Sequence, residues 1–307
     1  MEALQKDLLS LSDQEIRYLC YEYIQDHCCY GSKFIRDMIL TDIKNEFIYH
    51  YRLESFVEKR ESSDALFPYY GQPVDGPENG PVPNLWDIPL GSPKWFIEEK
   101  QSVEIPHTSS VVTCETCDGR KKVRCPRCLG TGMVQCLRCL GSGKDNEETK
   151  CSVCRGTGKI SCWVCDQTGT VICKTCSGNG RVKHQMHLDV TWKIHHENFF
   201  TNTYTLPKLL LLEAEGKEIL RQEGKTVQPI QFQHNTILNE GLAELIAKHK
   251  SLFSEEKILA QRHHLRAIPL TKIMYAWKGK RGEFFVYGFQ KRVFFENYPQ
   301  RRCCICC

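Results

Sequence analysis

Residues 114–143 read CETCDGRKKVRCPRCLGTGMVQCLRCLGSG, and residues 151–180 read CSVCRGTGKISCWVCDQTGTVICKTCSGNG. The two stretches contain six Cys-x-x-Cys pairs, whose first cysteines lie 11, 11, 15, 11 and 11 residues apart. A fixed period of this kind indicates a repeat architecture, and it decides how the middle of the chain folds. The pairs are Cys114/Cys117, Cys125/Cys128, Cys136/Cys139, Cys151/Cys154, Cys162/Cys165 and Cys173/Cys176.

The spacing within each pair suits a metal site. Two intervening residues let one tight turn aim both sulfur atoms at one ion, and two pairs complete a tetrahedral Cys₄ site, which typically holds Zn²⁺. Glycine after the second cysteine accepts positive φ, so the backbone can curl beneath the metal and offer amide N–H groups to sulfur. Twelve cysteines therefore predict three zinc sites.

We call each pair with the residues that follow it a knuckle. Four knuckles carry the full pattern Cys-x-x-Cys-x-Gly-x-Gly. The first knuckle lacks the second glycine, and the fifth knuckle has Gln167 in place of the first glycine. The knuckle glycines are Gly119, Gly130, Gly132, Gly141, Gly143, Gly156, Gly158, Gly169, Gly178 and Gly180.

Two pairings of the knuckles are compatible with the spacing. The spacing is symmetric about the longer gap, which contains GSGKDNEETK at residues 141–150, and this indicates the tip of a long hairpin. A hairpin predicts nested pairing, and the alternative is pairing between neighbouring knuckles. Nested pairing joins Cys136/Cys139 with Cys151/Cys154, Cys125/Cys128 with Cys162/Cys165, and Cys114/Cys117 with Cys173/Cys176.

Zinc is expected to supply the stability of this segment. Residues 112–183 include few large apolar side chains, and each structural zinc contributes roughly 10–16 kcal/mol in comparable peptides. We therefore expect chelation to unfold residues 112–183 and to leave the flanks partly folded.

The rest of the composition points to a folded protein in a reducing compartment. The chain has 307 residues, 19 cysteines and a formal net charge of +4. The N-terminus has no apolar signal region, and no apolar run reaches the ~20 residues of a membrane helix. Paired cysteines without a secretory signal are expected to bind metal before they form disulfides.

The repeat resembles the cysteine-rich region of DnaJ-type chaperones. Those proteins carry four copies of Cys-x-x-Cys-x-Gly-x-Gly and pair them in nested fashion around two zinc ions, so the resemblance implies the hairpin. This chain differs because it has six copies and no His-Pro-Asp tripeptide. A J-domain, and with it stimulation of an Hsp70 partner, is therefore not expected.

The flanks make the resemblance narrower. The chain resembles the SSU-two homologue family, animal proteins with a DnaJ-like cysteine-rich centre. The resemblance implies a protein without known enzymatic activity, a cytoplasmic and nuclear location, and a role in tooth formation in vertebrates. It rests on RLESF (52–56), DGP (75–77), LWDIPL (85–90), PHTSS (106–110), IPLTKI (268–273), YGFQKRVFFENYP (287–299) and the final CCICC.

We predict an α+β fold, in which a mixed helix and strand body is interrupted by the extended zinc-knuckle β-hairpin. The predicted domains are an N-terminal α+β segment (1–111), the cysteine-rich domain (112–183) and a C-terminal α+β segment (184–307). The two flanking segments form either one body or two separate domains.

A capping box of Ser12 and Glu15 predicts the first helix. A second helix is expected from Ser32 to about Glu46, and KGKRGE (278–283) is typical of a hairpin turn. The remaining expectations are strands at 47–58, 95–105 and 187–194, a loop at 71–83, helices at 206–222 and 239–264, and strands at 265–278, 283–289 and 292–296.

We expect a non-enzymatic adaptor or chaperone-like protein that binds a protein client. No Gly-x-Ser-x-Gly or phosphate-binding glycine loop is present, and the histidine pairs at 195–196 and 263–264 are expected on the surface or at helix ends. The candidate binding side chains, which would otherwise pack between knuckles, are Leu129, Leu137, Leu140, Trp163 and Val164.

Two other functions are compatible with the sequence. Residues 112–183 hold thirteen Lys and Arg and six Asp and Glu, a net charge of +7. Nucleic-acid binding is therefore one alternative, although twelve thiolates with three Zn²⁺ reduce the charge to about +1. Thiol–disulfide exchange is the second alternative, since Cys-x-x-Cys motifs can be redox-active.

The C-terminal RRCCICC is open to several interpretations. Its cysteines are either simply exposed, paired with Cys28 and Cys29 under oxidation, bound to a further metal, or lipidated. Contact with a membrane is expected only in the last case. The candidates for lipidation are Cys303, Cys304, Cys306 and Cys307.

Overall fold

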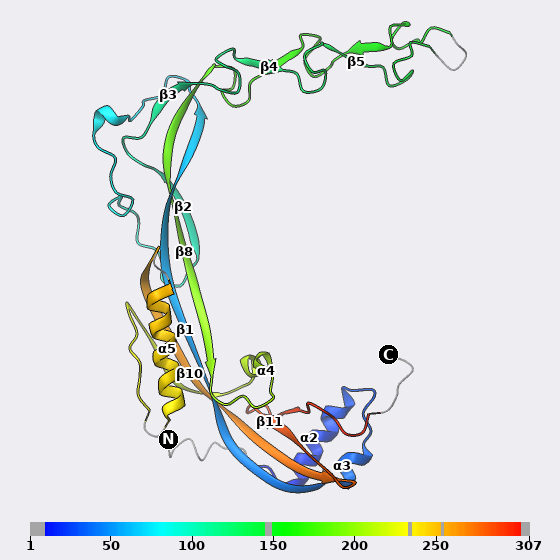
Figure 1. The fold of residues 1–307 in the computed structure, drawn as a ribbon, viewed down its shortest axis with the longest axis vertical. Coiled ribbons are helices and arrows are strands. Elements are labelled where there is room, and N and C mark those ends of the chain that lie inside the picture. The colour runs from blue at the N-terminus through cyan, green and yellow to red at the C-terminus, as the bar shows by residue number, and fades with distance from the viewer. Residues whose placement is uncertain (1–9, 145–148, 233–234, 253–254, 302–307) are drawn as a thin grey trace. The chain divides into compact units, whose positions relative to one another are not determined.

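The structure is a computed structural model that describes residues 10–144, 149–232, 235–252 and 255–301 (Figure 1). The chain divides into two compact units. The first unit comprises residues 1–59, 93–99 and 192–307, and the second comprises 60–92 and 100–191. The predicted cysteine-rich domain, 112–183, thus lies within the second unit.

The fold is mixed, with few helices and mostly sheet, which confirms this much of the predicted class. The helices are α2 (Asp13–Gln25), α3 (Lys33–Asp37), α4 (Lys208–Glu213) and α5 (Thr236–Leu252), with a 3₁₀ turn at Pro77–Asn79. The strands are β1 (Ile39–Pro68), β2 (Glu99–Glu104), β3 (Ser110–Thr113), β4 (Lys122–Arg124), β5 (Met133–Gln135), β6 (Lys159–Ser161), β7 (Thr170–Ile172), β8 (Arg181–Phe200), β9 (Lys217–Gly224), β10 (Glu256–Trp277), β11 (Lys280–Tyr287) and β12 (Arg292–Phe294).

The main sheet has the strand order β12-β11-β10-β1-β8-β2, with β9 beside β10 and β3 beside β8. In the first unit β1 and β10 pair antiparallel from Ile39 opposite Ala276 to Lys59 opposite Glu256 (Figure 1). Alternate side chains of such strands point to opposite faces, and apolar side chains are buried on both: Ile48 and Ile268 belong to one cluster, and Tyr51 and Leu265 belong to another.

Helices cover the sheet of the first unit through apolar clusters. Ile16 of α2 and Phe34 of α3 pack with Phe284 of β11. Leu242 of α5 packs with Tyr51 of β1. Burial of this kind contributes roughly 25 cal/mol per Å² of apolar surface, so the first unit is stabilised by an ordinary hydrophobic core.

The start of α2 confirms the predicted capping box. The Ser12 side chain accepts a hydrogen bond from the backbone N–H of Glu15 (3.3 Å), and the Glu15 carboxylate accepts one from the backbone N–H of Ser12 (2.9 Å). Two N–H groups that the helix itself leaves unpaired are thereby satisfied.

Three predicted helices are wrong in extent. The helix after Ser32 ends at Asp37, because residues 39–46 pair with β10 instead. The helix expected at 206–222 ends at Glu213. Three residues later the backbone of Gly216 approaches that of Ala267, and a Cβ added to Gly216 would lie 2.7 Å from the carbonyl oxygen of Ala267. The helix expected at 239–264 ends at Leu252, since residues 256–264 pair with β1 and, near their end, with β9.

The predicted strands agree better with the structure. The intervals 47–58 and 187–194 lie inside β1 and β8, and the strand expected at 95–105 is shorter, at Glu99–Glu104. Lys278 and Gly279 form the predicted turn between β10 and β11, with φ of 50° and 76°. Within the described ranges, no helix combines the length and apolar character required to cross a lipid bilayer.

In the second unit, short strands alternate with the knuckles. Strand β4 pairs antiparallel with β7, and β5 pairs antiparallel with β6 (Figure 1). Strand β3 pairs with the beginning of β8, where Val112 lies opposite Val182. Each of these pairings brings together knuckles that are far apart in sequence.

Candidate metal centres

The twelve knuckle cysteines come together as three groups of four. All twelve side chains are buried, and within each group the sulfur atoms lie within 4.8 Å of one another. This arrangement confirms the nested pairing and excludes pairing between neighbours. Site 1 consists of Cys114, Cys117, Cys173 and Cys176, site 2 of Cys125, Cys128, Cys162 and Cys165, and site 3 of Cys136, Cys139, Cys151 and Cys154.

The distances between sulfur atoms suit a tetrahedral metal. Cys114 and Cys173 Sγ are 3.7 Å apart, and the corresponding distances between paired knuckles range from 3.6 to 3.9 Å. A tetrahedron with Zn–S bonds of about 2.3 Å has edges of about 3.8 Å. A disulfide would need about 2.05 Å. Each group can therefore hold one Zn²⁺ through four thiolates.

Backbone amides support the sulfur atoms. The N–H of the second knuckle glycine donates to the second cysteine in four knuckles, for example from Gly143 to Cys139 Sγ at 3.3 Å. The others are Gly132 to Cys128, Gly158 to Cys154 and Gly180 to Cys176, each at 3.2 Å. Such bonds stabilise thiolate charge and orient metal ligands.

These glycines also allow paired knuckles to approach closely. A Cβ added to Gly143 would lie 2.4 Å from the carbonyl oxygen of Gly156, and one added to Gly158 would lie 2.3 Å from that of Gly141. Both glycines have positive φ, 75° and 72°. A larger residue would push the two knuckles of site 3 apart, so these two positions require glycine for steric reasons.

The thiols of sites 2 and 3 differ in their pKa values. Burial opposes ionisation of Cys128, but the N–H of Gly132 and the neighbouring thiols outweigh it and lower the pKa of Cys128 to about 6. The same balance, with Gly158, lowers the pKa of Cys154 to about 6. Burial dominates at Cys165 and raises its pKa to about 12. A bound dication would supply the positive charge that four adjacent thiolates need.

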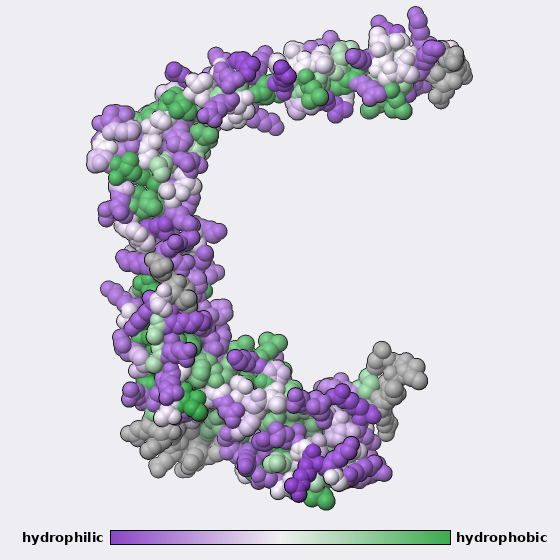
Figure 2. Space-filling view, viewed as in Figure 1, coloured by the Kyte–Doolittle hydropathy of each residue, from purple (hydrophilic) through white to green (hydrophobic). Residues whose placement is uncertain are grey.

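The candidate binding side chains are exposed on the surface of the knuckles. Leu129, Leu140 and Leu137 are 76%, 73% and 70% exposed, and Trp163 and Val164 are 56% and 47% exposed. In Figure 2, apolar residues lie among polar ones over this part of the surface. The guanidinium of Arg127 lies 3.7 Å from the centre of the Trp163 ring, a cation–π contact between the two knuckles of site 2.

The histidine pairs lie on strands rather than at helix ends. His263 is buried on β10, where Nδ1 lies 3.0 Å from the Tyr51 hydroxyl. The neighbouring His264 has Nε2 2.9 Å from a carboxylate oxygen of Glu218. His195 on β8 has Nε2 2.7 Å from Glu256. The prediction of surface or helix-end histidines is therefore wrong for His263.

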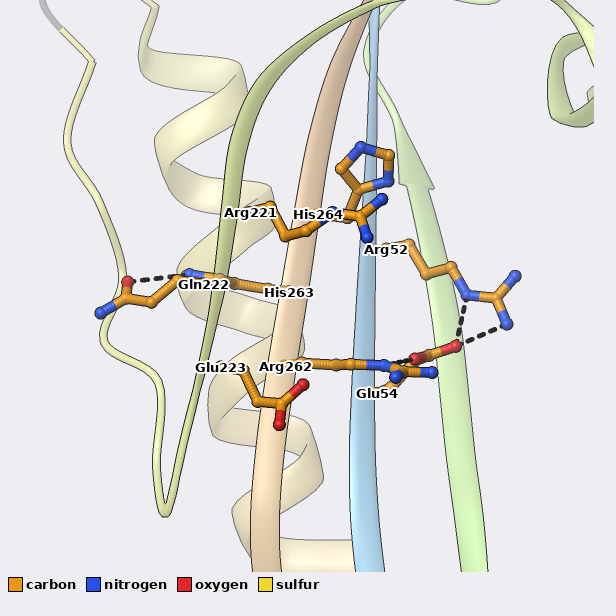
Figure 3. Close-up of a pocket in the computed structure, with 8 residues that line it drawn as sticks. All are labelled: Arg52, Glu54, Arg221, Gln222, Glu223, Arg262, His263 and His264. Atoms are coloured by element: carbon orange, nitrogen blue, oxygen red, sulfur yellow. Dashed lines mark hydrogen bonds and ion pairs between the residues drawn. The ribbon is translucent and has the colours of Figure 1, made fainter. Parts of the chain in front are cut away.

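A polar groove of about 440 Å³ lies beside His264 (Figure 3). Sequence reasoning missed it, although β1, β9 and β10 each place charged residues at alternate positions. Register sets Glu54 opposite Arg262, and Arg262 opposite Glu223. The lining residues are Arg52, Glu54, Arg221, Gln222, Glu223, Arg262, His263 and His264.

Ion pairs occupy the central carboxylate of this groove. Arg52 Nη2 lies 2.7 Å from Glu54 Oε1, and Arg262 binds the other oxygen, as the dashed lines in Figure 3 show. Burial opposes ionisation of Glu54, but hydrogen bonds from Arg262 and Arg52 hold its pKa below the usual value. A carboxylate held in this way is poorly suited to accept a proton from a substrate.

Three further cysteines among the described residues, Cys20, Cys28 and Cys29, lie outside the three groups. Cys28 is exposed and its sulfur lies 3.6 Å from that of Cys29. Cys20 is buried in the core of the first unit, and burial raises its pKa to about 12. The proposed lipidation sites Cys303, Cys304, Cys306 and Cys307 lie outside the described residues.

No family model matches the sequence. The chain is 38% identical over 300 residues to the human protein SSUH2 homolog, which covers 97% of this chain and 80% of that protein. It is 39% identical over 298 residues to the Danio rerio protein SSUH2 homolog (96% and 82%) and 44% identical over 222 residues to that of Mus musculus (72% and 65%). The chain therefore belongs to the SSUH2 homolog family.

Proposed function

We propose that this chain is a zinc-stabilised, non-enzymatic interaction protein. In this proposal, zinc in the three Cys₄ sites holds the six knuckles as one extended β-hairpin, and the outward side chains of sites 2 and 3 bind a segment of a client protein. The observation that carries the proposal is a difference in surface between site 1 and the other two sites.

Site 1 has no large apolar residue within its Cys-x-x-Cys pairs or at the position directly after them. These positions carry Glu115, Thr116 and Asp118 in one knuckle and Lys174, Thr175 and Ser177 in the other. The hydroxyls of Thr116 and Thr175 lie 3.0 Å apart across the site. The knuckle fold therefore does not need apolar residues at these positions.

Sites 2 and 3 carry apolar residues at the same positions, where they add a cost. Leu129 and Leu140 occupy the position of Asp118 and have positive φ of 51° and 45°. A bulky residue in this conformation is rare, and Asp or Asn is better tolerated. Exposure of the same side chains to water is a second cost. Backbone strain and apolar exposure at one position favour a binding role for the side chain.

The proposed absence of catalysis has two supports. The knuckle cysteines are buried in groups whose spacing suits metal, which leaves no isolated Cys-x-x-Cys pair among them for thiol exchange. In the groove of Figure 3, both oxygens of Glu54 bind guanidinium groups. The alternative of a thiol–disulfide oxidoreductase predicts fast insulin reduction by zinc-loaded protein, whereas this proposal predicts none.

The test replaces the apolar residues by those of site 1. The variant Leu129→Asp/Leu137→Glu/Leu140→Ser should retain three zinc ions and lose the ability to suppress aggregation of a heat-denatured model client at moderate salt. The control variant Val112→Thr/Ile172→Ser changes exposed apolar residues on β3 and β7 and should retain it. Unchanged suppression by the first variant with three zinc ions bound contradicts the proposed binding surface.

Nucleic-acid binding remains the second candidate function. It rests on the basic stretch Arg120, Lys121 and Lys122 with Arg124 and Arg127. The cation–π contact of Trp163 with Arg127 covers one face of the ring, which weakens the case for base stacking. RNA binding that falls steeply with salt would favour this candidate. The cytoplasmic and nuclear location and the role in tooth formation stay predictions.

A further inference from the structure

In the first unit, the last described residues of the chain lie beside the cysteine pair at positions 28–29. Arg301 forms an antiparallel β-bridge with Tyr30, the residue that follows this pair. The carbonyl oxygen of Gln300 accepts a hydrogen bond from the backbone N–H of Gly31 (2.9 Å). The point at which the C-terminal tail leaves the first unit is therefore next to these two cysteines.

Further contacts hold this end of the chain in place. The side-chain oxygen of Gln300 accepts a hydrogen bond from the backbone N–H of Phe34 (2.7 Å). The buried Tyr298 donates its hydroxyl to the carbonyl oxygen of Gly31 (2.6 Å), and its ring stacks on that of Tyr30 with centroids 4.3 Å apart. Satisfied hydrogen bonds and buried aromatic contacts of this kind fix the position from which the tail starts.

Four cysteines follow this fixed point closely and lie outside the described residues: Cys303, Cys304, Cys306 and Cys307. An extended chain advances about 3.3–3.6 Å per residue, so the Cα atom of Cys303 is within about 7 Å of that of Arg301. Continued by two positions, the antiparallel register of the bridge would set position 303 opposite position 28. The tail thiols can thus reach the pair at 28–29 without a change in the first unit.

The sulfur atoms of the pair are spaced like two ligands of one metal ion. The Sγ atoms of Cys28 and Cys29 are 3.6 Å apart, within the range of 3.6–3.9 Å found across sites 1, 2 and 3. A disulfide between them would need about 2.05 Å. The tail cysteines directly follow two arginines in the sequence, and nearby positive charge favours the thiolate form that binds metal.

The pair differs from the zinc sites in ways that favour another ion. Its cysteines are adjacent in the sequence rather than two residues apart, and Cys28 is exposed, whereas all twelve knuckle cysteines are buried. Structural zinc sites are closed and use four ligands. Cu(I) is a soft ion that thiolates select, and it is commonly held by fewer than four sulfur atoms.

We propose that Cys28, Cys29 and at least one tail cysteine form an exposed Cu(I) site, separate from the three zinc sites. Each thiol that binds the ion releases its proton to water as the sulfur–copper bond forms. Copper enters and leaves as Cu(I), so no electron is transferred.

The test uses the full-length, zinc-loaded chain under anaerobic conditions. One equivalent of Cu(I) is supplied as its complex with bicinchoninate, a coloured chelator that reports transfer by loss of absorbance. Native mass spectrometry should then find one copper ion in addition to three zinc ions. The double variant Cys28→Ser/Cys29→Ser should keep three zinc ions and bind Cu(I) more than about a hundredfold more weakly, a larger loss than an outer-shell change causes.

A second variant tests the contribution of the tail. Replacement of all four tail cysteines by serine should weaken Cu(I) binding to a similar degree, and again leave three zinc ions bound. The control Cys20→Ala removes a buried thiol of the same unit and should leave the affinity for Cu(I) unchanged.

Three results would overturn the proposal. Unchanged affinity in either serine variant would show that the two sets of thiols do not bind one ion together. Displacement of zinc by the added copper would place the copper in the knuckles instead. A fourth zinc ion in copper-free protein, lost in both serine variants, would contradict the assignment of this site to Cu(I).

Discussion

Equivalent positions in the six knuckles share one backbone conformation, although they hold different residue types. The position after the second cysteine has positive φ in all six knuckles, between 45° and 53°, whether it holds Asp118, Leu129 or Arg155. Two positions where glycine is expected hold Lys121 and Gln167, and these keep φ of 69° and 66°. The metal-binding turn therefore imposes its geometry on residues that do not favour it.

This strain predicts a stabilising substitution. Gln167→Gly should raise the stability of site 2 by about 0.5–1 kcal/mol, because glycine adopts φ near 66° without steric cost. Competition with a chelator, followed by absorbance or native mass, measures the change in zinc retention. Gln222→Gly on β9 is the matched control. It should destabilise the first unit, since glycine weakens a strand. Equal or weaker zinc retention in Gln167→Gly contradicts the argument.

A buried histidine predicts how stability depends on pH. His50 is 4% exposed, accepts a hydrogen bond at Nδ1 from Arg266 (2.8 Å), and has Nε2 2.8 Å from the side-chain oxygen of Asn198. Burial lowers its pKa from 6.5 to about 4. Between pH 6.5 and 4 the unfolded chain binds a proton at His50, whereas the folded chain does not. The free energy of unfolding is therefore unaffected by His50 above pH 6.5 and decreases as the pH falls towards 4.

The loss at His50 should amount to roughly 2–3 kcal/mol. Urea unfolding of wild type and His50→Gln at pH 7.5 and 4.5 measures it, and the difference between the two proteins cancels contributions from other groups and from zinc. Stability of the variant should fall less with acidification. Parallel losses in both proteins would show that His50 does not titrate in this way.

At the scale of elements, local patterns predicted the zinc sites and failed at the long strands. Cysteine spacing contains the ligand geometry of each pair within a few residues. The symmetric spacing and the resemblance to DnaJ-type repeats favoured the nested groups, although spacing also allowed pairing between neighbours. Residues 256–264, in contrast, carry no local sign of β structure strong enough to override a helical pattern. Their pairing with β1 and β9 is made by residues distant in sequence, and tertiary contacts of this kind outweigh local propensity.

The pairing of knuckles predicts how zinc is lost when one site is removed. Replacing all four cysteines of site 1 by serine should reduce bound zinc by one ion, because the other two sites are complete without it. Pairing between neighbouring knuckles would instead make the first and sixth knuckles belong to different sites, so two ions would be lost. Native mass spectrometry distinguishes the two outcomes.

At the scale of the whole molecule, the two units are stabilised by different means. The first unit has clusters of aromatic and aliphatic side chains, such as Phe34 with Phe284. In residues 112–183 each cluster consists of four cysteines with one or two small aliphatic residues, for example Val134 and Val171 at site 2. Bonds to a metal in the three Cys₄ groups would replace the hydrophobic core in this part of the chain.

Chelation should therefore affect the two units unequally. After zinc removal under reducing conditions, amide hydrogens of residues 112–183 should exchange within seconds, while β10 and β11 of the first unit remain protected. Hydrogen-exchange mass spectrometry at peptide resolution measures both. Unchanged protection of residues 112–183 in metal-free protein would mean that zinc does not stabilise this segment.

The zinc content of protein purified without chelators or oxidants tests the central claim most directly. Native mass spectrometry should find three Zn²⁺ ions per chain, with the twelve cysteines of sites 1, 2 and 3 protected from alkylation. Clearly fewer than three ions, with these cysteines freely alkylated in the folded protein, would contradict the account.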